Sequence, residues 1–288
     1  MSFFGASKDD PFRVGEVIYA GSIWGNNRGY SDVSAKTVRN TPIDTSVRNL
    51  VLIVAGQSNR TSVAPSAYTP SNPSQIDNLN IYDGQMYVAA DPMLGCSYID
   101  GGFGTPVIGC VALRVADLFI TNGQFDRVII VPIAVAATTI ANWDTGGALE
   151  NRIGAAVQRC IARGIVPGMT NVTFAIEWGQ GEGDYATSQI VYAAALNRVI
   201  ANSVAAGFVG RWFVALESYA NGAAFAQIVA AQASVTDNVT VFQSADADSL
   251  IGANRAVYGG DDTHFSDVGN AALATLIYNA MHASGSPY

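Results

Sequence analysis

The stretch that decides the fold is Leu50-Val51-Leu52-Ile53-Val54-Ala55-Gly56-Gln57-Ser58-Asn59, in which an apolar run ends in a short polar turn. A continuous apolar run of this length, bounded by a turn, is typical of a buried strand in a parallel sheet. We therefore predict a strand at Leu50–Ala55 that delivers Ser58 to a sharp turn at its carboxyl end.

Candidate strands and helices alternate along the rest of the chain. Strands are expected at Leu50–Ala55, Asn80–Tyr82, Arg127–Ile133, Val172–Trp178, Trp212–Glu217 and Val239–Gln243. Helical spacing of apolar residues marks Pro106–Thr121, Gly147–Arg163, Thr187–Ala206, Gly222–Ser234 and Asp267–Ala283, with Asp267 as an N-cap. This alternation predicts an α/β fold, a three-layer α/β/α sandwich with a mainly parallel sheet of five or six strands. Ligands of such sheets bind beyond the carboxyl ends of the strands.

A serine, a histidine and a carboxylate provide candidate acyl-transfer chemistry. The chain has two histidines, and His282 lies near the end of the last expected helix, where helix-end histidines are common. His264 is thus the candidate base for Ser58, and Asp261 stands three positions before it. The plainer interpretations are a helix N-cap for Ser58 and a loop residue capping the helix near Asp267 for His264.

Three ordered blocks resemble the SGNH (GDSL-like) hydrolases. They are Gly56-Gln57-Ser58-Asn59, Trp178-Gly179-Gln180-Gly181-Glu182 and Asp261-x-x-His264-Phe265. The first two blocks are similar to the sialate O-acetylesterase-like branch, which includes acetylxylan esterases of carbohydrate esterase family six. Segments 90–94 and 131–143 also match that branch, so the resemblance runs from about Leu50 to about Ala283.

The resemblance implies a flavodoxin-like SGNH hydrolase fold and a serine esterase that removes O-acetyl groups from a carbohydrate. It assigns Ser58 as the nucleophile, His264 as the general base and Asp261 as the acid that orients His264. The neighbouring Asp262 is the competitor for the last role, and a solvated loop position is its plainer interpretation.

The same resemblance nominates donors for the oxyanion of the tetrahedral intermediate. They are the backbone amides of Ser58 and Gly104, with Gly102 as the alternative, and the side-chain amide of Gln180. The plainer interpretations are a flexible glycine loop before Pro106 and, for Gln180, an ordinary polar residue in a turn.

Substrate contacts are expected at Gln57, Asn59 and Trp143. An indole face stacks well on a sugar ring, so Trp143 suits stacking and core packing equally, whereas Trp178 at a strand end suits the core. The chain departs from the family at Ala136-Ala137, which replace paired glycines, so this loop should adopt positive φ less freely.

Length and composition fit one catalytic domain at residues 49–288, preceded by an extension at residues 1–48. The 288 residues are 49% hydrophobic, which is enough for a large core. The extension lies outside the resemblance and suits packing along the domain, homo-oligomerisation or attachment to a larger assembly.

Charge and motifs exclude several other classes of protein. A net charge of −8 with only two lysines argues against a nucleic-acid partner and favours an acetylated, otherwise neutral glycan. We expect no membrane span, no metal site and no cofactor, because the sequence lacks the corresponding runs and motifs. The first ten residues lack signal-peptide features, so the chain either is not exported by that route or has lost the signal.

The three cysteines, Cys96, Cys110 and Cys160, are expected to be reduced core residues, with one disulfide and a free thiol as the alternative. Two alternative functions remain. One is a catalytically weak glycan-binding or structural protein, for example one associated with a virion. The other is a lipase or thioesterase of the same superfamily.

Overall fold

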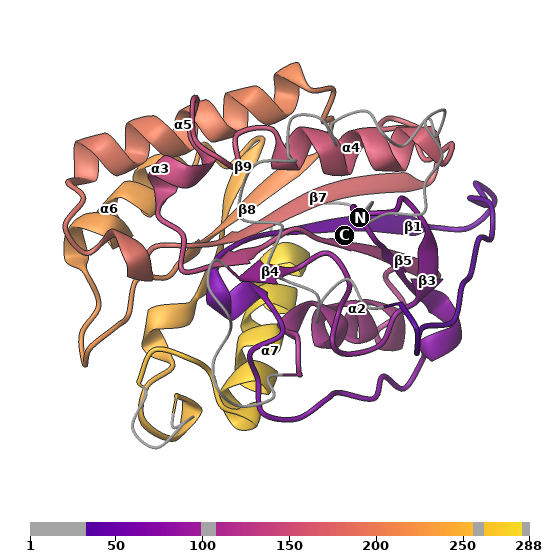
Figure 1. The fold of residues 1–288 in the computed structure, drawn as a ribbon, viewed down its shortest axis with the longest axis horizontal. Coiled ribbons are helices and arrows are strands. Elements are labelled where there is room, and N and C mark those ends of the chain that lie inside the picture. Colours follow the sequence, from indigo (N-terminus) through magenta and orange to yellow (C-terminus); the bar gives the residue numbers. More distant parts are fainter. Residues whose placement is uncertain (1–32, 99–107, 256–261, 284–288) are drawn as a thin grey trace, which may run out of the picture.

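The computed structural model describes residues 33–98, 108–255 and 262–283. In these ranges a seven-stranded sheet runs through the molecule, with helices on both of its faces (Figure 1). The strand order is β3-β2-β5-β1-β7-β8-β9, and every neighbouring pair is parallel except β2 and β3. The bounds are β1 Asn49–Gly56, β2 Ile76–Leu79, β3 Met86–Val88, β5 Arg127–Pro132, β7 Val172–Gly179, β8 Arg211–Leu216 and β9 Val241–Asp246. A separate parallel pair is formed by β4 Ser97–Tyr98 and β6 Val135–Ala136.

Strand β1 is buried along its whole length, and its side chains alternate between two cores. Val51 and Ile53 enter the core under one helical layer, whereas Leu50 and Leu52 enter the core under the other. The first layer contains α3 Ile140–Trp143, α4 Arg152–Ala162, α5 Gln189–Ala205 and α6 Ala226–Ser234, and the second contains α2 Val111–Thr121 and α7 Asp267–Ala283 (Figure 1). Burial on both faces explains why the strand is a continuous apolar run.

The strand order reverses direction between β1 and β7. The chain passes from β1 to β2 and β5 on one side of β1, and then crosses to β7, β8 and β9 on the other side. Such a reversal opens a crevice at the carboxyl ends of the two strands. Gly56 permits their close approach, because a β-carbon there would lie 1.9 Å from the Gly179 carbonyl oxygen and its φ is +128°.

The sheet is larger than the five or six strands predicted, since β3 adds an antiparallel edge. The strand predicted at Asn80–Tyr82 is wrong: β2 ends at Leu79, and residues 81–83 form a turn. The Asn80 side chain accepts a hydrogen bond from the Tyr82 amide, and the Asp83 side chain accepts one from the Gln85 amide. These local bonds replace the strand ladder, as asparagine and aspartate commonly do in turns.

Most helices begin later than their apolar spacing predicts, and the short helix α3 was not predicted. Only α7 matches its predicted range at both ends. Its N-cap, however, is Ser266 rather than Asp267, because Ser266 Oγ accepts a hydrogen bond from the Gly269 amide. Asp267 is the first helical residue, and its carboxylate accepts a hydrogen bond from the Ser66 amide.

The described part of the N-terminal extension packs along the edge strand β3. Val38 forms an antiparallel bridge with Tyr87, and Arg39 makes an ion pair of 3.1 Å with Asp77. These contacts cover an otherwise open sheet edge, and the role of residues 1–48 stays a prediction. Residues 1–32 lie outside the described ranges.

All three cysteines are buried and unpaired, as the simpler prediction stated. Burial raises the pKa of the Cys160 thiol to about 12. Among the described helices, none combines the length and the apolar character that a membrane crossing requires.

Candidate active site

Ser58 begins a single 3₁₀ turn, Ser58–Arg60, immediately after β1. The Gln57 amide donates to the Gly179 carbonyl at 2.9 Å, which ties the entry of the turn to β7. The Thr61 amide and hydroxyl donate to the Ser58 carbonyl at 2.9 and 2.7 Å, which fixes its exit. Ser58 is thus held at the β1–β7 crevice, where it is only 4% exposed.

His264 reaches Ser58 from the other end of the chain. Its Nε2 lies 2.9 Å from Ser58 Oγ across 206 residues of sequence, and the residue is 8% exposed. The histidine stands three residues before α7. The residue before it, Thr263, accepts a hydrogen bond from Asn59, just beyond the carboxyl end of β1. The sequence-predicted nucleophile and base are therefore in hydrogen-bond contact.

Two predicted members of the site, Asp261 and Gly104, lie outside the described residues, as does Gly102. Asp262 is described, and its carboxylate points at the turn after β8. A β-carbon built on Gly222 would lie 3.6 Å from Asp262 Oδ2. This direction agrees with the loop role that the sequence assigned to Asp262.

Gln180 is buried and its side-chain amide bonds to protein groups, so its oxyanion role stays a prediction. Its Nε2 donates to Asp184 Oδ2 at 2.6 Å and to Gln57 Oε1 and the Thr138 carbonyl at 3.1 Å each. Its Oε1 accepts from the Tyr192 hydroxyl at 2.8 Å. Both amide hydrogens are therefore used inside the protein, and Gln180 ties the β7 loop to its neighbours.

The three predicted substrate contacts are also turned largely inward. Trp143 is 1% exposed, donates from Nε1 to Thr138 Oγ1 and packs edge-on against Trp178, so it belongs to the core and presents no face to a sugar. Asn59 is 2% exposed and donates to Glu182 and to the Thr263 carbonyl. Gln57 turns its Oε1 inward to accept from Gln180 and the Gly183 amide, and substrate contact through its amide nitrogen stays a prediction.

The loop with Ala136-Ala137 behaves differently from its prediction. Ala137 adopts a φ of +59° although it carries a β-carbon. The next residue, Thr138, supplies the carbonyl that accepts from Gln180. The surrounding contacts thus hold an alanine in a conformation that costs about 1–2 kcal/mol.

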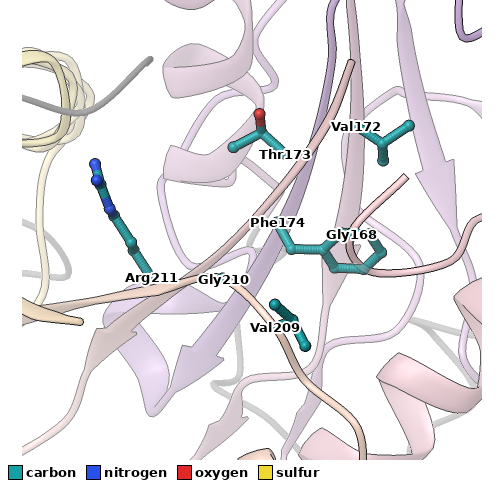
Figure 2. A pocket seen from close by; sticks show the side chains of 7 residues that line it. All are labelled: Gly168, Val172, Thr173, Phe174, Val209, Gly210 and Arg211. Carbon is teal, nitrogen blue, oxygen red and sulfur yellow. The ribbon is translucent and has the colours of Figure 1, made fainter. Parts of the chain in front are cut away.

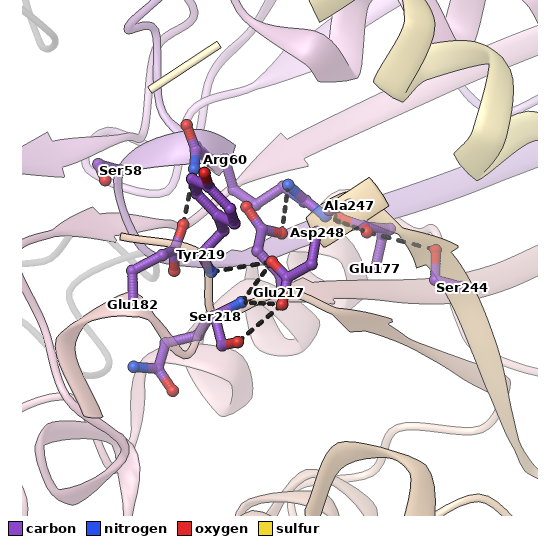
Figure 3. Close-up of polar contacts among 12 residues, drawn as sticks. Ser58, Arg60, Glu177, Glu182, Glu217, Ser218, Tyr219, Ser244, Ala247 and Asp248 are labelled. Atoms are coloured by element: carbon purple, nitrogen blue, oxygen red, sulfur yellow. Dashed lines mark hydrogen bonds and ion pairs between the residues drawn. The ribbon is translucent and has the colours of Figure 1, made fainter. Parts of the chain in front are cut away.

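A buried group of charges lies beside the nucleophile, and sequence reasoning missed it (Figure 3). The Arg60 guanidinium is fully buried and binds both oxygens of Glu177, at 2.6 and 2.9 Å. Its Nη1 forms an ion pair with Glu217 at 2.8 Å. Gly179 makes room for it, because a β-carbon there would lie 2.2 Å from Arg60 Cζ. The sequence does contain a signal for this group, because Glu177 and Glu217 each stand within or at the end of an apolar run that predicts a buried strand.

The pKa values of this group reflect burial and mutual charge. Burial alone would lower the pKa of Arg60, but Glu177 and Glu217 outweigh it, so the pKa is raised and the guanidinium stays charged. Burial raises the pKa of Glu177. Burial, together with the charge of Glu217, raises the pKa of Glu182 well above its usual range.

A pocket lies at the amino-terminal ends of the strands, away from Ser58, and lacks a serine–histidine pair (Figure 2). It has a volume of about 220 Å³ and is lined by Gly168 and by residues 172–174 and 209–211, where β7 and β8 begin. Neither a histidine nor a carboxylate lines it, so the Thr173 hydroxyl has no general base there. Within the described ranges, no cluster of histidine, cysteine, aspartate and glutamate is arranged to hold a metal ion.

Residues 48–283 match the family described as "Carbohydrate esterase, sialic acid-specific acetylesterase". The match spans most of the chain, so this protein belongs to that family of carbohydrate esterases. It is accordingly an ester hydrolase, and membership implies an acetylated carbohydrate as its substrate. Comparison with curated protein sequences gave no match.

Solved structures share the fold at low sequence identity. A protein of Arabidopsis thaliana is 19% identical with a TM-score of 0.63, and the alignment covers 82% of this chain and 98% of that one. NanS is 14% identical with a TM-score of 0.52, covering 82% of this chain and 96% of its own. At these identities the likeness concerns the arrangement of helices and strands.

Proposed function

We propose that this chain is a serine esterase that removes O-acetyl groups from a glycan, with Ser58 as nucleophile and His264 as general base. The observation that carries the proposal is the 2.9 Å contact between His264 Nε2 and Ser58 Oγ at the β1–β7 crevice. Asp261, by its position before His264, is the proposed carboxylate that orients the imidazole.

The proposed reaction follows from this contact. His264 Nε2 accepts the Ser58 proton as Oγ attacks the acetyl carbonyl carbon, and the backbone amides of Ser58 and Gly104 stabilise the oxyanion. When the ester bond breaks, His264 returns the proton to the departing sugar hydroxyl. A water molecule then attacks acetyl-Ser58, with His264 as base, and acetate leaves.

An exposed aromatic side chain supports a sugar platform in a place other than Trp143. Tyr185 is 66% exposed and follows the β7 loop, and its ring centroid lies 6.2 Å from that of Phe225. Gly183, two residues earlier, donates to the side chain of Gln57, which precedes the nucleophile. Two residues of chain span at most about 7 Å, so the ring lies within reach of a glycan that extends from the site.

Hydrolysis of p-nitrophenyl acetate, butyrate and octanoate by the wild type and Ser58→Ala tests the proposal. We expect the acetate to be the preferred ester and Ser58→Ala to lose roughly 10⁴-fold or more in kcat. Preference for the octanoate would favour a lipase. Unchanged activity in Ser58→Ala would rule out this nucleophile, and an inactive wild type that binds glycan would favour the binding protein.

The platform is tested separately with acetylated glycan polymers. Tyr185→Ala should raise KM for the polymer several-fold, about 1 kcal/mol of lost stacking, and leave p-nitrophenyl acetate hydrolysis unchanged. Ile190→Ala, an 82% exposed apolar position on α5, is the control. Equal effects of both variants on the polymer would remove Tyr185 from the proposal.

A further inference from the structure

The carbonyl of Thr263, directly before His264, is held by two buried side chains. Asn59 Nδ2 donates to it at 3.2 Å, and Arg255 Nη1 donates to it from another direction. Asn59 is the residue after Ser58, so a single side-chain amide joins the nucleophile turn to the loop that carries the histidine.

Asn59 is in turn fixed by the loop after β7. Its Nδ2 donates to Glu182 Oε1 at 2.6 Å, and both side chains are almost fully buried. The amide thus spans three loops that are distant in sequence, those after β1 and β7 and the one before α7. A buried amide with two acceptors has little freedom to move, because each lost hydrogen bond would leave a polar group unsatisfied.

Arg255 is held just as firmly. Its Nε and Nη2 donate to the carbonyls of Leu250 and Ala247 at 2.6 and 2.8 Å, and the side chain is 1% exposed. Its guanidinium carbon lies 4.2 Å from the ring centroid of Phe265, the residue after His264. Arg255 therefore contacts the chain on both sides of the histidine.

We propose that Asn59 and Arg255 are positioning residues, which fix the Thr263 carbonyl and thereby hold the His264 ring against Ser58. The Thr263 carbonyl and the His264 amide belong to one planar peptide unit, so fixing that unit fixes the His264 N–Cα bond, and the Arg255–Phe265 contact restricts the chain on the other side of the histidine. The inference rests on the proposed function, since it concerns the geometry of the Ser58–His264 pair. It replaces the substrate contact that the sequence suggested for Asn59.

The test compares two buried asparagines at opposite ends of β1. Asn59→Ala should lower kcat for p-nitrophenyl acetate by roughly 10- to 100-fold with little change in KM, because a displacement of about 1 Å costs rate rather than binding. Asn49→Ala is the matched control: Asn49 is also buried, and its amide donates to the carbonyls of Asp44, Val47 and Asn171. It should lose stability and keep kcat.

A second pair of variants covers the case in which Asn59→Ala fails to fold. Arg255→Lys keeps the positive charge and one donating nitrogen in place of three, whereas Arg255→Met donates nothing, so the lysine variant should retain more kcat. Arg159→Lys is its control, since Arg159 is buried and donates to the carbonyls of Ile81 and Tyr82 at a distance from the site. Equal kcat in Arg255→Lys, Arg255→Met and Arg159→Lys, or a rise in KM alone for Asn59→Ala, would overturn the inference.

Ser58→Ala in the same assay separates the two proposals. If it abolishes turnover while the Asn59 and Arg255 variants retain wild-type kcat, only the positioning inference fails. If it retains turnover, the proposed nucleophile itself is wrong.

Discussion

An exposed acidic side chain where the parallel strands begin (the amino-terminal edge of the sheet) and two buried ones where they end (the carboxyl edge) have pKa values shifted in opposite directions. At the amino-terminal edge, a hydrogen bond from the Arg48 side chain lowers the pKa of Asp126, and both residues are well exposed. At the carboxyl edge, burial raises the pKa of Glu177 and Glu182, and the compensating charge of Arg60 is itself fully buried. The exposed charges at the amino-terminal edge are mutually favourable. The buried charges at the carboxyl edge carry a desolvation cost beside the nucleophile, as charges at functional sites often do.

Removing the cation from each edge should give the largest contrast. Arg60→Met leaves Glu177 and Glu217 buried without their partner and should cost about 3–5 kcal/mol of unfolding free energy. Arg48→Met breaks an exposed pair and should cost far less, because solvent screens the exposed charges. Urea unfolding of both variants measures the difference, and equal losses would remove the contrast between the edges.

Glu182 and Asp126 should contribute to the pH dependence of stability with opposite signs. Folding raises the pKa of Glu182. Above about pH 4.3 the unfolded chain loses this proton while the folded chain still holds it, so stability falls as the pH rises. Glu182→Gln should flatten the decline in unfolding free energy as the pH rises above about 4.3, which urea unfolding at a series of pH values measures.

Asp126→Asn is the control with the opposite expectation. The pKa of Asp126 is lowered on folding, so its contribution is present above about pH 3.9 and is lost as pH falls. The variant should be less stable than wild type at pH 7 and equal to it in strong acid. The same pH slope in both variants would show that the raised pKa of Glu182 plays no part.

The smallest effect concerns backbone conformation. The turns before β7 and β9, at the amino-terminal edge, place asparagines at positive φ, Asn171 at +56° and Asn238 at +55°. The carboxyl edge places Ala137 at +59°. Ala137→Gly should raise the unfolding free energy by about 0.5 kcal/mol, because glycine avoids the β-carbon clash, while Asn238→Gly should be nearly neutral. A thermal melt of each variant decides this, and a loss of stability in Ala137→Gly would contradict it.

Sequence patterns predicted the parallel sheet and the pairing of Ser58 with His264 because the sequence left few alternatives to either. The apolar run of β1 reports burial on both faces, and only two histidines competed for the base. The edge strand β3 and the turn at residues 81–83 were missed, since the side chains of Asn80 and Asp83 accept backbone hydrogen bonds that override the apolar pattern. The directions of Gln180 and Asn59 depend on partners from distant loops, so a linear pattern could not reveal them.

The central claim is that Ser58, activated by His264, attacks the ester. Mass spectrometry after treatment with a serine-directed phosphonate tests it most directly, with wild type, Ser58→Ala and His264→Gln side by side. We expect one phosphonyl group on the peptide that contains Ser58 in the wild type, none there in Ser58→Ala and far slower labelling in His264→Gln. Labelling at a different residue, or equal rates in wild type and His264→Gln, would contradict it.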